Sequence, residues 1–239
     1  MPRDQLITPQ RVLVVAAHPD DIEFGAGGTI ARWVAEGATV HDLVVTRGDK
    51  GSDDPATDPA ELAVRRETEQ RAAAGELGVA SVEFLDEADA RVEPTLELRE
   101  QVTRAIRRHR PEVVLSHDPT VLFVNNEWVN HADHRAVGQV VVDAVFPAAR
   151  DPLNFPEHRA AGLEPWKVSE MYLWSTNEAN QLVDIGDTLD RKVAALRHHA
   201  SQFRDFAETE RWIRRRAEEL GERAGYRAAE GFRRVILAR

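Results

Sequence analysis

The segment His18-Pro19-Asp20-Asp21 places an imidazole and two carboxylates directly after an apolar run, Arg11–Ala17. Acidic and imidazole groups at the end of a buried strand must be solvated or neutralised by a partner, and a metal ion is such a partner. His18 and Asp21 are three residues apart, so a tight turn stiffened by Pro19 can aim both at one point while Asp20 reaches a bound water. The competing interpretation is a helix N-cap, because Asp is a preferred capping residue.

A second motif, His131-Ala132-Asp133-His134, repeats the three-residue spacing. On a helix this spacing brings both histidines onto one face. Taken alone, the motif also fits a solvated helix start. Taken with the first motif, two histidines and a carboxylate make a three-ligand set with room for water, as in hydrolytic zinc sites. Spacing alone leaves open which aspartate of the first motif binds the metal.

Composition narrows the classes of protein to which this chain can belong. The 239 residues include no cysteine, which excludes disulfides, thiolate metal sites and cysteine nucleophiles. A net charge of −10 argues against general nucleic-acid binding. No apolar run approaches the roughly 20 residues that cross a bilayer, and Met1 to Arg11 lacks the pattern of a signal peptide. We therefore expect a cytoplasmic protein without membrane or nucleic-acid partners.

The elements that must position the two motifs follow the pattern of a parallel sheet wrapped by helices. Strands are predicted at Arg11–Ala17, Thr39–Thr46, Ser81–Asp86, Glu112–His117, Val168–Ser175, Leu182–Ile185 and Phe232–Leu237. Helices are predicted at Gly27–Glu36, Pro59–Leu77, Pro94–His109, His134–Ala149, Asp187–Phe203 and Glu208–Gly221. The expected fold class is α/β, a Rossmann-like three-layer sandwich with a mostly parallel central sheet, in one domain spanning residues 1–239.

Three segments lacking a helix or strand pattern are expected to wall a pocket at the carboxyl ends of the strands, where open α/β sheets bind ligands. They are Arg47–Asp58, Asp118–Asn130 and Asp151–Trp166. Within or beside these segments the candidate substrate-binding residues are Arg47, Trp128 and Asn130. The alternative for Arg47, given equal weight, is that its side chain forms an ion pair with Asp49 or Asp53.

The two motifs resemble those of the LmbE-like, or PIG-L, family of zinc N-deacetylases. The first reads AHPDDIEFGAGGTIA from Ala17 to Ala31, and the second reads HADHRAVG from His131 to Gly138. Further similarity lies in TRGDKG, RRETEQRAAAGELGV and KVAALRHHASQF, so the resemblance covers most of the chain to about residue 203.

The resemblance implies a role for each residue of the two motifs. His18, Asp21 and His134 would bind Zn²⁺, and Asp20 would be the general base that takes a proton from the metal-bound water. His131 would stabilise the tetrahedral oxyanion or protonate the leaving amine. Some relatives carry a tyrosine where this chain has Val129, so its assistance is not expected here.

The resemblance implies that the function is hydrolysis of the N-acetyl group of an N-acetylglucosamine-type conjugate, a small-molecule substrate. The resemblance also implies that the chain can form a homo-oligomer. The alternatives are a metal-dependent hydrolase of another amide or of a phosphoester, and a Rossmann-type nucleotide-binding protein. The last is disfavoured because Ile30 stands where the final glycine of the dinucleotide fingerprint belongs, and because Asp42 lies inside the second strand.

Overall fold

The computed structural model describes residues 8–238. Residues 1–7, which belong to the N-terminal segment predicted to lack a signal peptide, lie outside the described residues. Within the described residues, seven strands form one sheet in the order β3-β2-β1-β4-β7-β9-β8. Strands β3, β2, β1, β4 and β7 run parallel, and β9 is antiparallel to its two neighbours. The strands are β1 Arg11–Ala16, β2 Thr39–Thr46, β3 Ser81–Glu87, β4 Val113–His117, β7 Glu170–Trp174, β8 Gln181–Asp184 and β9 Ala229–Ile236.

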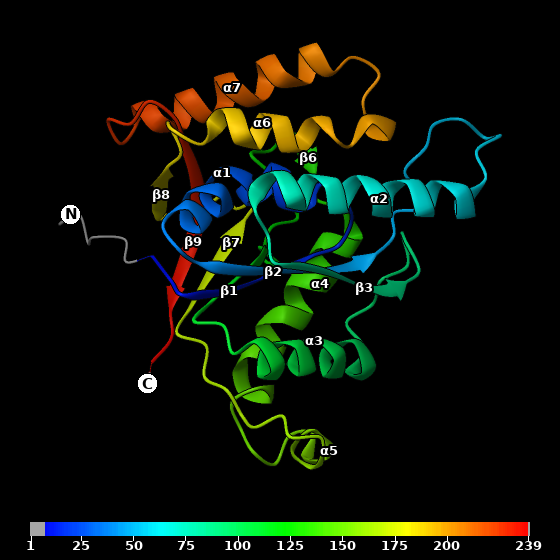
Figure 1. Cartoon of the computed structure of the whole chain (residues 1–239), viewed down its shortest axis with the longest axis vertical. Coiled ribbons are helices and arrows are strands. Elements are labelled where there is room, and N and C mark those ends of the chain that lie inside the picture. Colours follow the sequence, from blue (N-terminus) through cyan, green and yellow to red (C-terminus); the bar gives the residue numbers. More distant parts are fainter. Residues whose placement is uncertain (1–7, 239) are drawn as a thin grey trace.

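Helices cover both faces of the sheet (Figure 1). On one face lie α1 (Asp21–Ala35) and α2 (Pro59–Leu77), with α6 (Leu189–Arg197) and α7 (Phe206–Glu222) stacked outside them. On the other face lie α3 (Leu96–His109) and α4 (Ala132–Asp143), the latter continued by a π-helical turn over Ala144–Ala148. The smaller elements are a hairpin of β5 (Phe123–Val124) and β6 (Trp128–Val129), α5 (Pro156–Ala160) and a 3₁₀ turn over Ala200–Gln202.

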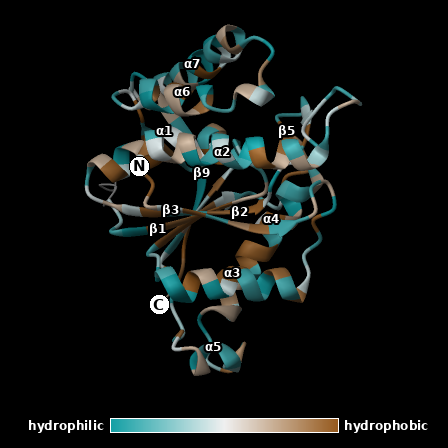
Figure 2. Cartoon of the chain, turned by 45° about the vertical axis from the view of Figure 1, so that its right-hand side comes forward, coloured by the Kyte–Doolittle hydropathy of each residue, from teal (hydrophilic) through white to brown (hydrophobic). Residues whose placement is uncertain are grey.

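The core follows from the near-continuous apolar character of the central strands. In β1, Leu13 and Val15 pack toward α3 and α4, whereas Val12 and Val14 pack toward α1 and α2. Figure 2 shows hydrophobic residues concentrated on the central strands and on α4, and hydrophilic residues on the outer turns of the helices. The predicted α/β sandwich with a mostly parallel sheet is confirmed. No helix among residues 8–238 has the length and apolar character needed to span a membrane.

Two predicted elements, Thr39–Thr46 and Pro59–Leu77, match the observed β2 and α2 residue for residue. By contrast, α1 begins at Asp21, six residues before the predicted start at Gly27. Glycine lowers helix propensity, but Gly25 is needed here: a Cβ built on it would lie 2.6 Å from the Trp174 ring. The helix therefore starts inside the first chemical motif.

The prediction that Asp151–Trp166 walls the pocket is wrong. This segment returns the chain from the end of α4 to the start of β7, so it lies at the amino ends of the parallel strands. There Trp166 Nε1 donates a hydrogen bond to the Pro111 carbonyl at 2.7 Å, just before β4. Phe155 is likewise remote, and its carbonyl accepts from Arg107 at 3.2 Å.

Candidate metal centre

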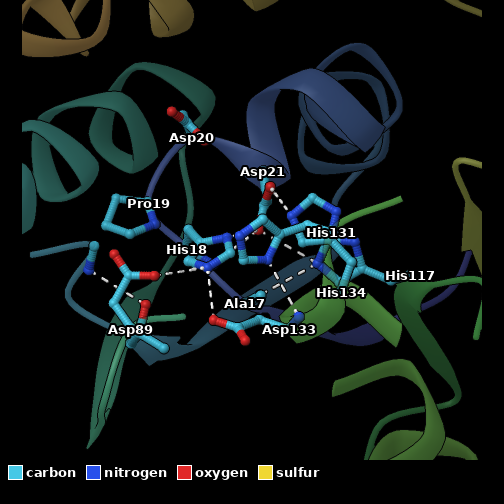
Figure 3. A network of polar contacts seen from close by, with 12 residues as sticks. Ala17, His18, Pro19, Asp20, Asp21, Asp89, His117, His131, Asp133 and His134 are labelled. Atoms are coloured by element: carbon cyan, nitrogen blue, oxygen red, sulfur yellow. Dashed lines mark hydrogen bonds and ion pairs between the residues drawn. The ribbon is translucent and has the colours of Figure 1, made fainter. Parts of the chain in front are cut away.

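Both histidine motifs lie at the carboxyl edge of the sheet, where β1 and β4 end. His18 follows β1, and Asp21 is the first residue of α1. His131 is the N-cap of α4, and His134 lies in its first turn. Gly138 lets α4 approach β4 closely, since a Cβ there would lie 2.6 Å from the His117 carbonyl oxygen. Figure 3 shows these side chains gathered around Asp21.

The Asp21 carboxylate is the hub of the cluster. Its Oδ1 lies 3.1 Å from His134 Nε2, and its Oδ2 lies 3.4 Å from His18 Nδ1. The backbone N–H of His18 also donates to Oδ2 at 2.8 Å, which fixes the turn between strand and helix. Although burial opposes this, the interactions of Asp21 with His134 and His117 hold the pKa of Asp21 well below its usual range. The carboxylate is therefore ionised and central.

Asn130 sets the tautomer of His134. Asn130 is 4% exposed, and its Nδ2 donates to the Val121 carbonyl at 2.9 Å, which fixes the orientation of the amide. Its Oδ1, an acceptor only, lies 3.2 Å from His134 Nδ1. Nδ1 must therefore carry the proton, and in a neutral ring the lone pair of Nε2 faces Asp21.

His18 is surrounded by three carboxylates. Its Nε2 lies 3.1 Å from both Asp89 Oδ1 and Asp133 Oδ2, while Nδ1 faces Asp21. Burial lowers the pKa of His18, but hydrogen bonds to Asp133, Asp21 and Asp89 outweigh it and raise that pKa to about 12. So many carboxylates around one imidazole leave an excess of negative charge at this point. A cation is what this environment favours, whether a proton on Nδ1 or a metal ion in its place.

His117 joins the cluster from the end of β4, and the sequence prediction missed it. Its Nδ1 accepts a hydrogen bond from Trp174 Nε1 at 3.0 Å, because an indole can only donate. Burial, and secondly the charge of His134, lower the pKa of His117 to about 4, so the ring is neutral. Its Nε2 accepts a hydrogen bond from the backbone N–H of Ala17 at 3.2 Å and lies 3.4 Å from Asp21 Oδ2. N–H donors therefore face both ring nitrogens of His117.

The described residues offer three overlapping groups of potential metal ligands at this edge of the sheet. They are His18, His131 and His134; Asp21, His117 and His134; and His18, Asp89 and Asp133. Because the Trp174 indole and the Ala17 amide both direct N–H groups at its ring nitrogens, His117 is less available to a metal ion than His18 and His134. His18 and His134 each have the outer nitrogen held by an oxygen acceptor and the inner nitrogen aimed at Asp21. A histidine held in this way by an outer partner is typical of metal sites.

His131 lies beside the other imidazoles, with its ring centroid 4.8 Å from that of His18. As the N-cap of α4, its Nδ1 accepts from the Asp133 backbone N–H at 3.2 Å. Burial, and next the charges of His18 and His134, lower the pKa of His131 below its ordinary value. The neutral ring therefore presents an Nε2–H donor beside the cluster.

Asp20 is held apart from the histidines (Figure 3). It has a left-handed backbone conformation with φ of 92°, which is strained for a non-glycine residue. Its Oδ2 accepts from Arg66 at 3.1 Å, and its N–H donates to Gln70 Oε1 at 2.9 Å. Burial raises the pKa of Asp20 to about 6, against the opposing charge of Arg66.

Glu23 supports this arrangement from behind. Its Oε1 accepts from Gln70 Nε2 at 2.9 Å and its Oε2 lies 3.1 Å from His199 Nε2. Glu23 thus orients the amide that holds the backbone of Asp20.

The predicted substrate-binding residues lie in different places. Trp128 lines the cavity next to the cluster, and its side chain is 62% exposed. Asn130 also lines it, although its amide is committed to His134 and Val121. Arg47 pairs with Asp86 and Glu67 instead and does not line the cavity.

The residues that sequence reasoning missed carry weak signals. Asp89 follows β3 outside any motif, but it lies at the carboxyl end of a predicted strand, as His18 does. His117 is the last residue of a predicted strand. The expectation that ligand-binding residues lie at the carboxyl ends of the strands therefore applies to its side chain as well.

A cavity of about 430 Å³ opens beside the cluster. Its floor includes Asp21, His117, His131 and His134. Its walls come from α1, α7, β9 and the β5–β6 hairpin. This volume is within the usual range for small-molecule sites.

Comparison with known proteins gives consistent matches. The family model PIG-L, described as GlcNAc-PI de-N-acetylase, matches residues 13–145. Diacetylchitobiose deacetylase of Thermococcus kodakarensis is 36% identical over 228 residues, covering 95% of this chain and 83% of that protein. The 1D-myo-inositol 2-acetamido-2-deoxy-alpha-D-glucopyranoside deacetylase of Rhodococcus erythropolis is 31% identical, covering 82% of this chain and 68% of that protein. The solved N,N'-diacetylchitobiose deacetylase of Pyrococcus horikoshii, in complex with an inhibitor, aligns with a TM-score of 0.88 at 32% identity, covering 95% of this chain and 84% of its own.

Proposed function

Because the chain belongs to the PIG-L family of de-N-acetylases, we propose that it is a zinc-dependent hydrolase of the N-acetyl group of N-acetylglucosamine-type conjugates. The observation that carries the zinc site is the pair of imidazole nitrogens, His18 Nδ1 and His134 Nε2, that face the ionised Asp21. Because seven strands from along the chain are hydrogen-bonded into one sheet, we also propose that residues 1–239 form one deacetylase domain.

The donor set supports zinc. Two imidazoles and one carboxylate match the ligands of catalytic zinc sites, which keep a position open. His18, Asp21 and His134 would hold the ion, with Asn130 and the Asp89–Asp133 pair fixing the two rings. When bound, Zn²⁺ lowers the pKa of a water ligand to about 7 and polarises a carbonyl oxygen.

Asp20 is the general base in this proposal. Arg66 engages Oδ2, and the contacts among the described residues leave Oδ1 to take the proton of the attacking water. A base whose pKa lies near the working pH is the most effective, and burial brings Asp20 to about 6. The strained backbone, held by Gln70, aims the carboxylate rather than capping the helix.

His131 would donate its Nε2–H to the carbonyl oxygen as negative charge develops there. The Asp133 amide occupies Nδ1, so the ring can donate at Nε2 without first gaining a proton. A fixed donor of this kind stabilises the oxyanion more than the neutral carbonyl. Return of a proton to the leaving amine then falls to protonated Asp20.

A phosphoesterase is less well supported. Phosphate chemistry favours cationic groups or a second metal, but the buried Lys192 is paired with Glu230 at 2.5 Å, and the buried Arg66 is paired with Asp20 at 3.1 Å. Trp128 remains the proposed sugar contact at the mouth, and Arg47 could serve only if it leaves Asp86 and Glu67.

Acetate released from N,N'-diacetylchitobiose and from an N-acetylglucosaminyl inositol tests the function. We expect release by the wild type, loss in His134→Ala, and wild-type release by the control His198→Ala, an exposed histidine at the end of α6. Equal release by His134→Ala and wild type would contradict the site.

A further inference from the structure

Asp20, the proposed general base, has a backbone conformation that the residues around it must impose. A φ of 92° is unfavourable for a residue with a Cβ and persists only where surrounding contacts over-determine it. Arg66 donates to Oδ2 of the carboxylate and to the Pro19 carbonyl. The N–H of Asp20 donates to Gln70 Oε1 at 2.9 Å. The orientation of the Gln70 amide therefore decides whether this N–H has an acceptor.

Glu23 fixes which way the Gln70 amide points. The Nε2 group of Gln70 can only donate, and it donates to Glu23 Oε1 at 2.9 Å. This leaves Oε1 of Gln70 toward the N–H of Asp20. Gln70 and Glu23 are both 0% exposed, so bulk water cannot take the place of either partner.

His199 holds the second oxygen of the Glu23 carboxylate. Its Nε2 lies 3.1 Å from Glu23 Oε2, and because a carboxylate oxygen accepts, the ring donates its Nε2–H. His199 is 0% exposed, and its Nδ1 has no hydrogen-bond partner among residues 8–238. The polar contact of this ring is thus directed at Glu23.

The segment that carries His199 is anchored independently of the metal centre. His199 follows α6 and directly precedes the 3₁₀ turn. In that turn Ser201 Oγ donates to Glu69 Oε2 of α2 at 2.6 Å, and Gln202 Nε2 donates to the Gly51 carbonyl at 3.2 Å. These contacts hold the turn in place, so they also fix the position of the His199 ring.

We propose that His199 is a positioning residue for the general base Asp20. It acts through two other buried side chains, Glu23 and Gln70, and it does not line the cavity. Without the N–H of His199, one oxygen of the Glu23 carboxylate would be buried with no donor, which is costly, and the carboxylate would have to move. Gln70 would then release the N–H of Asp20. The inference rests on the proposed role of Asp20.

The first test removes the donor and keeps a planar ring. On the zinc-loaded enzyme, His199→Phe should lower kcat for acetate release from N,N'-diacetylchitobiose by about 10- to 100-fold, because a small misplacement of a catalytic group has an effect of this size. KM and zinc affinity should stay near those of the wild type, because the hydrogen bond of His199 goes to Glu23 and not to a proposed metal ligand. His199→Gln, which can offer an N–H to Glu23, should recover most of the lost kcat.

His198→Phe is the matched control. His198 directly precedes His199 and is exposed, so the same substitution places its ring in solvent. The kcat of this variant should equal that of the wild type.

A double-mutant cycle separates positioning from a general loss of structure. If His199 acts only through the carboxylate of Asp20, His199→Phe should have no further effect on kcat once Asp20→Asn has removed the base. The same fold-loss in both backgrounds would assign a structural role to His199 and overturn the inference. Unchanged kcat in a folded His199→Phe variant would overturn it as well.

Hydrogen–deuterium exchange followed by NMR gives a readout without turnover. In the metal-free proteins, the N–H of Asp20 should lose its protection in His199→Phe and keep it in His198→Phe, because exchange requires the hydrogen bond to open. Protection of this N–H in His199→Phe equal to that in the wild type would contradict the inference.

Failure of this inference is distinguishable from failure of the proposed function. No acetate release by the wild type contradicts the function and leaves the exchange comparison to decide whether His199 holds the backbone of Asp20. If His199→Phe does not fold, Gln70→Met removes the hydrogen bonds in the middle of the same chain of contacts and enters the same cycle. If neither variant folds, these contacts serve folding alone and the inference is overturned.

Discussion

The side-chain oxygen of Asn130 lies 3.2 Å from Nδ1 of His134, and this contact determines which imidazole nitrogen faces Asp21. The Val121 carbonyl fixes the side-chain amide of Asn130, and this amide in turn fixes the His134 ring. The lone pair of His134 Nε2 then points toward the proposed metal position. A residue predicted from sequence as a substrate contact thereby acquires a positioning role.

Asn130→Leu removes the acceptor while keeping a side chain of similar size. Loss of an outer partner of a ligand histidine weakens metal binding by about 10- to 100-fold, and we expect that loss for Zn²⁺ measured by competition with a chelator. Asn130→Asp retains an acceptor and should stay closer to the wild type. Unchanged affinity in Asn130→Leu would remove Asn130 from the centre.

His117→Phe tests whether His117 belongs to the metal ligands. If His117 only packs beside Asp21 without binding the metal, zinc affinity should fall by about tenfold and stoichiometric binding should survive. His134→Ala should abolish that binding. Equal losses in the two variants, measured by zinc content after dialysis, would show that His117 belongs to the ligand set.

Asp20→Asn keeps the size of the side chain and removes the base. We expect kcat to fall by about 10²- to 10⁴-fold with zinc affinity near that of the wild type. Chelator competition and steady-state kinetics on the same preparation make the comparison. A parallel loss of metal would mean that Asp20 is a ligand.

The sequence placed the residues of the two motifs together, but it did not predict the contacts that orient them. The valine-rich strands and the two motifs placed His18, Asp21, His131 and His134 at one sheet edge, because such strands end together. Each of these residues carries a local signal: a turn, a spacing, or a helix start.

The supporting contacts had no such signal. His117 meets Asp21 only because β4 lies beside β1, and its Nδ1 is held by Trp174 from β7. Asp89 reaches His18 from the turn after β3. Likewise, three prolines suggested that Asp151–Trp166 was a pocket wall, but its connection to a parallel strand places it at the opposite edge.

Asp42 tests the cost of a buried carboxylate. It is 2% exposed in β2, and neither carboxylate oxygen has a hydrogen-bond partner among the described residues. Burial, and next the charge of Glu23, raise its pKa well above its ordinary value. Asp42→Val should therefore raise the free energy of unfolding near pH 7 by about 1–3 kcal/mol.

The pH dependence of this effect has a definite sign. The folded-state pKa of Asp42 lies above the unfolded value of about 3.9, so its contribution to stability is lost as pH rises from that value through the folded pKa. In urea unfolding, the advantage of Asp42→Val should grow between pH 5 and pH 8. A constant or shrinking advantage would contradict the assignment.

The most direct test of the central claim is reconstitution of the chelator-treated wild type with Zn²⁺, followed by acetate release from N,N'-diacetylchitobiose. We predict that release is lost on chelation and returns in proportion to added zinc, with saturation at about one equivalent, as expected for a three-ligand site with one open position. Undiminished acetate release by the metal-free protein would contradict a metal-dependent deacetylase.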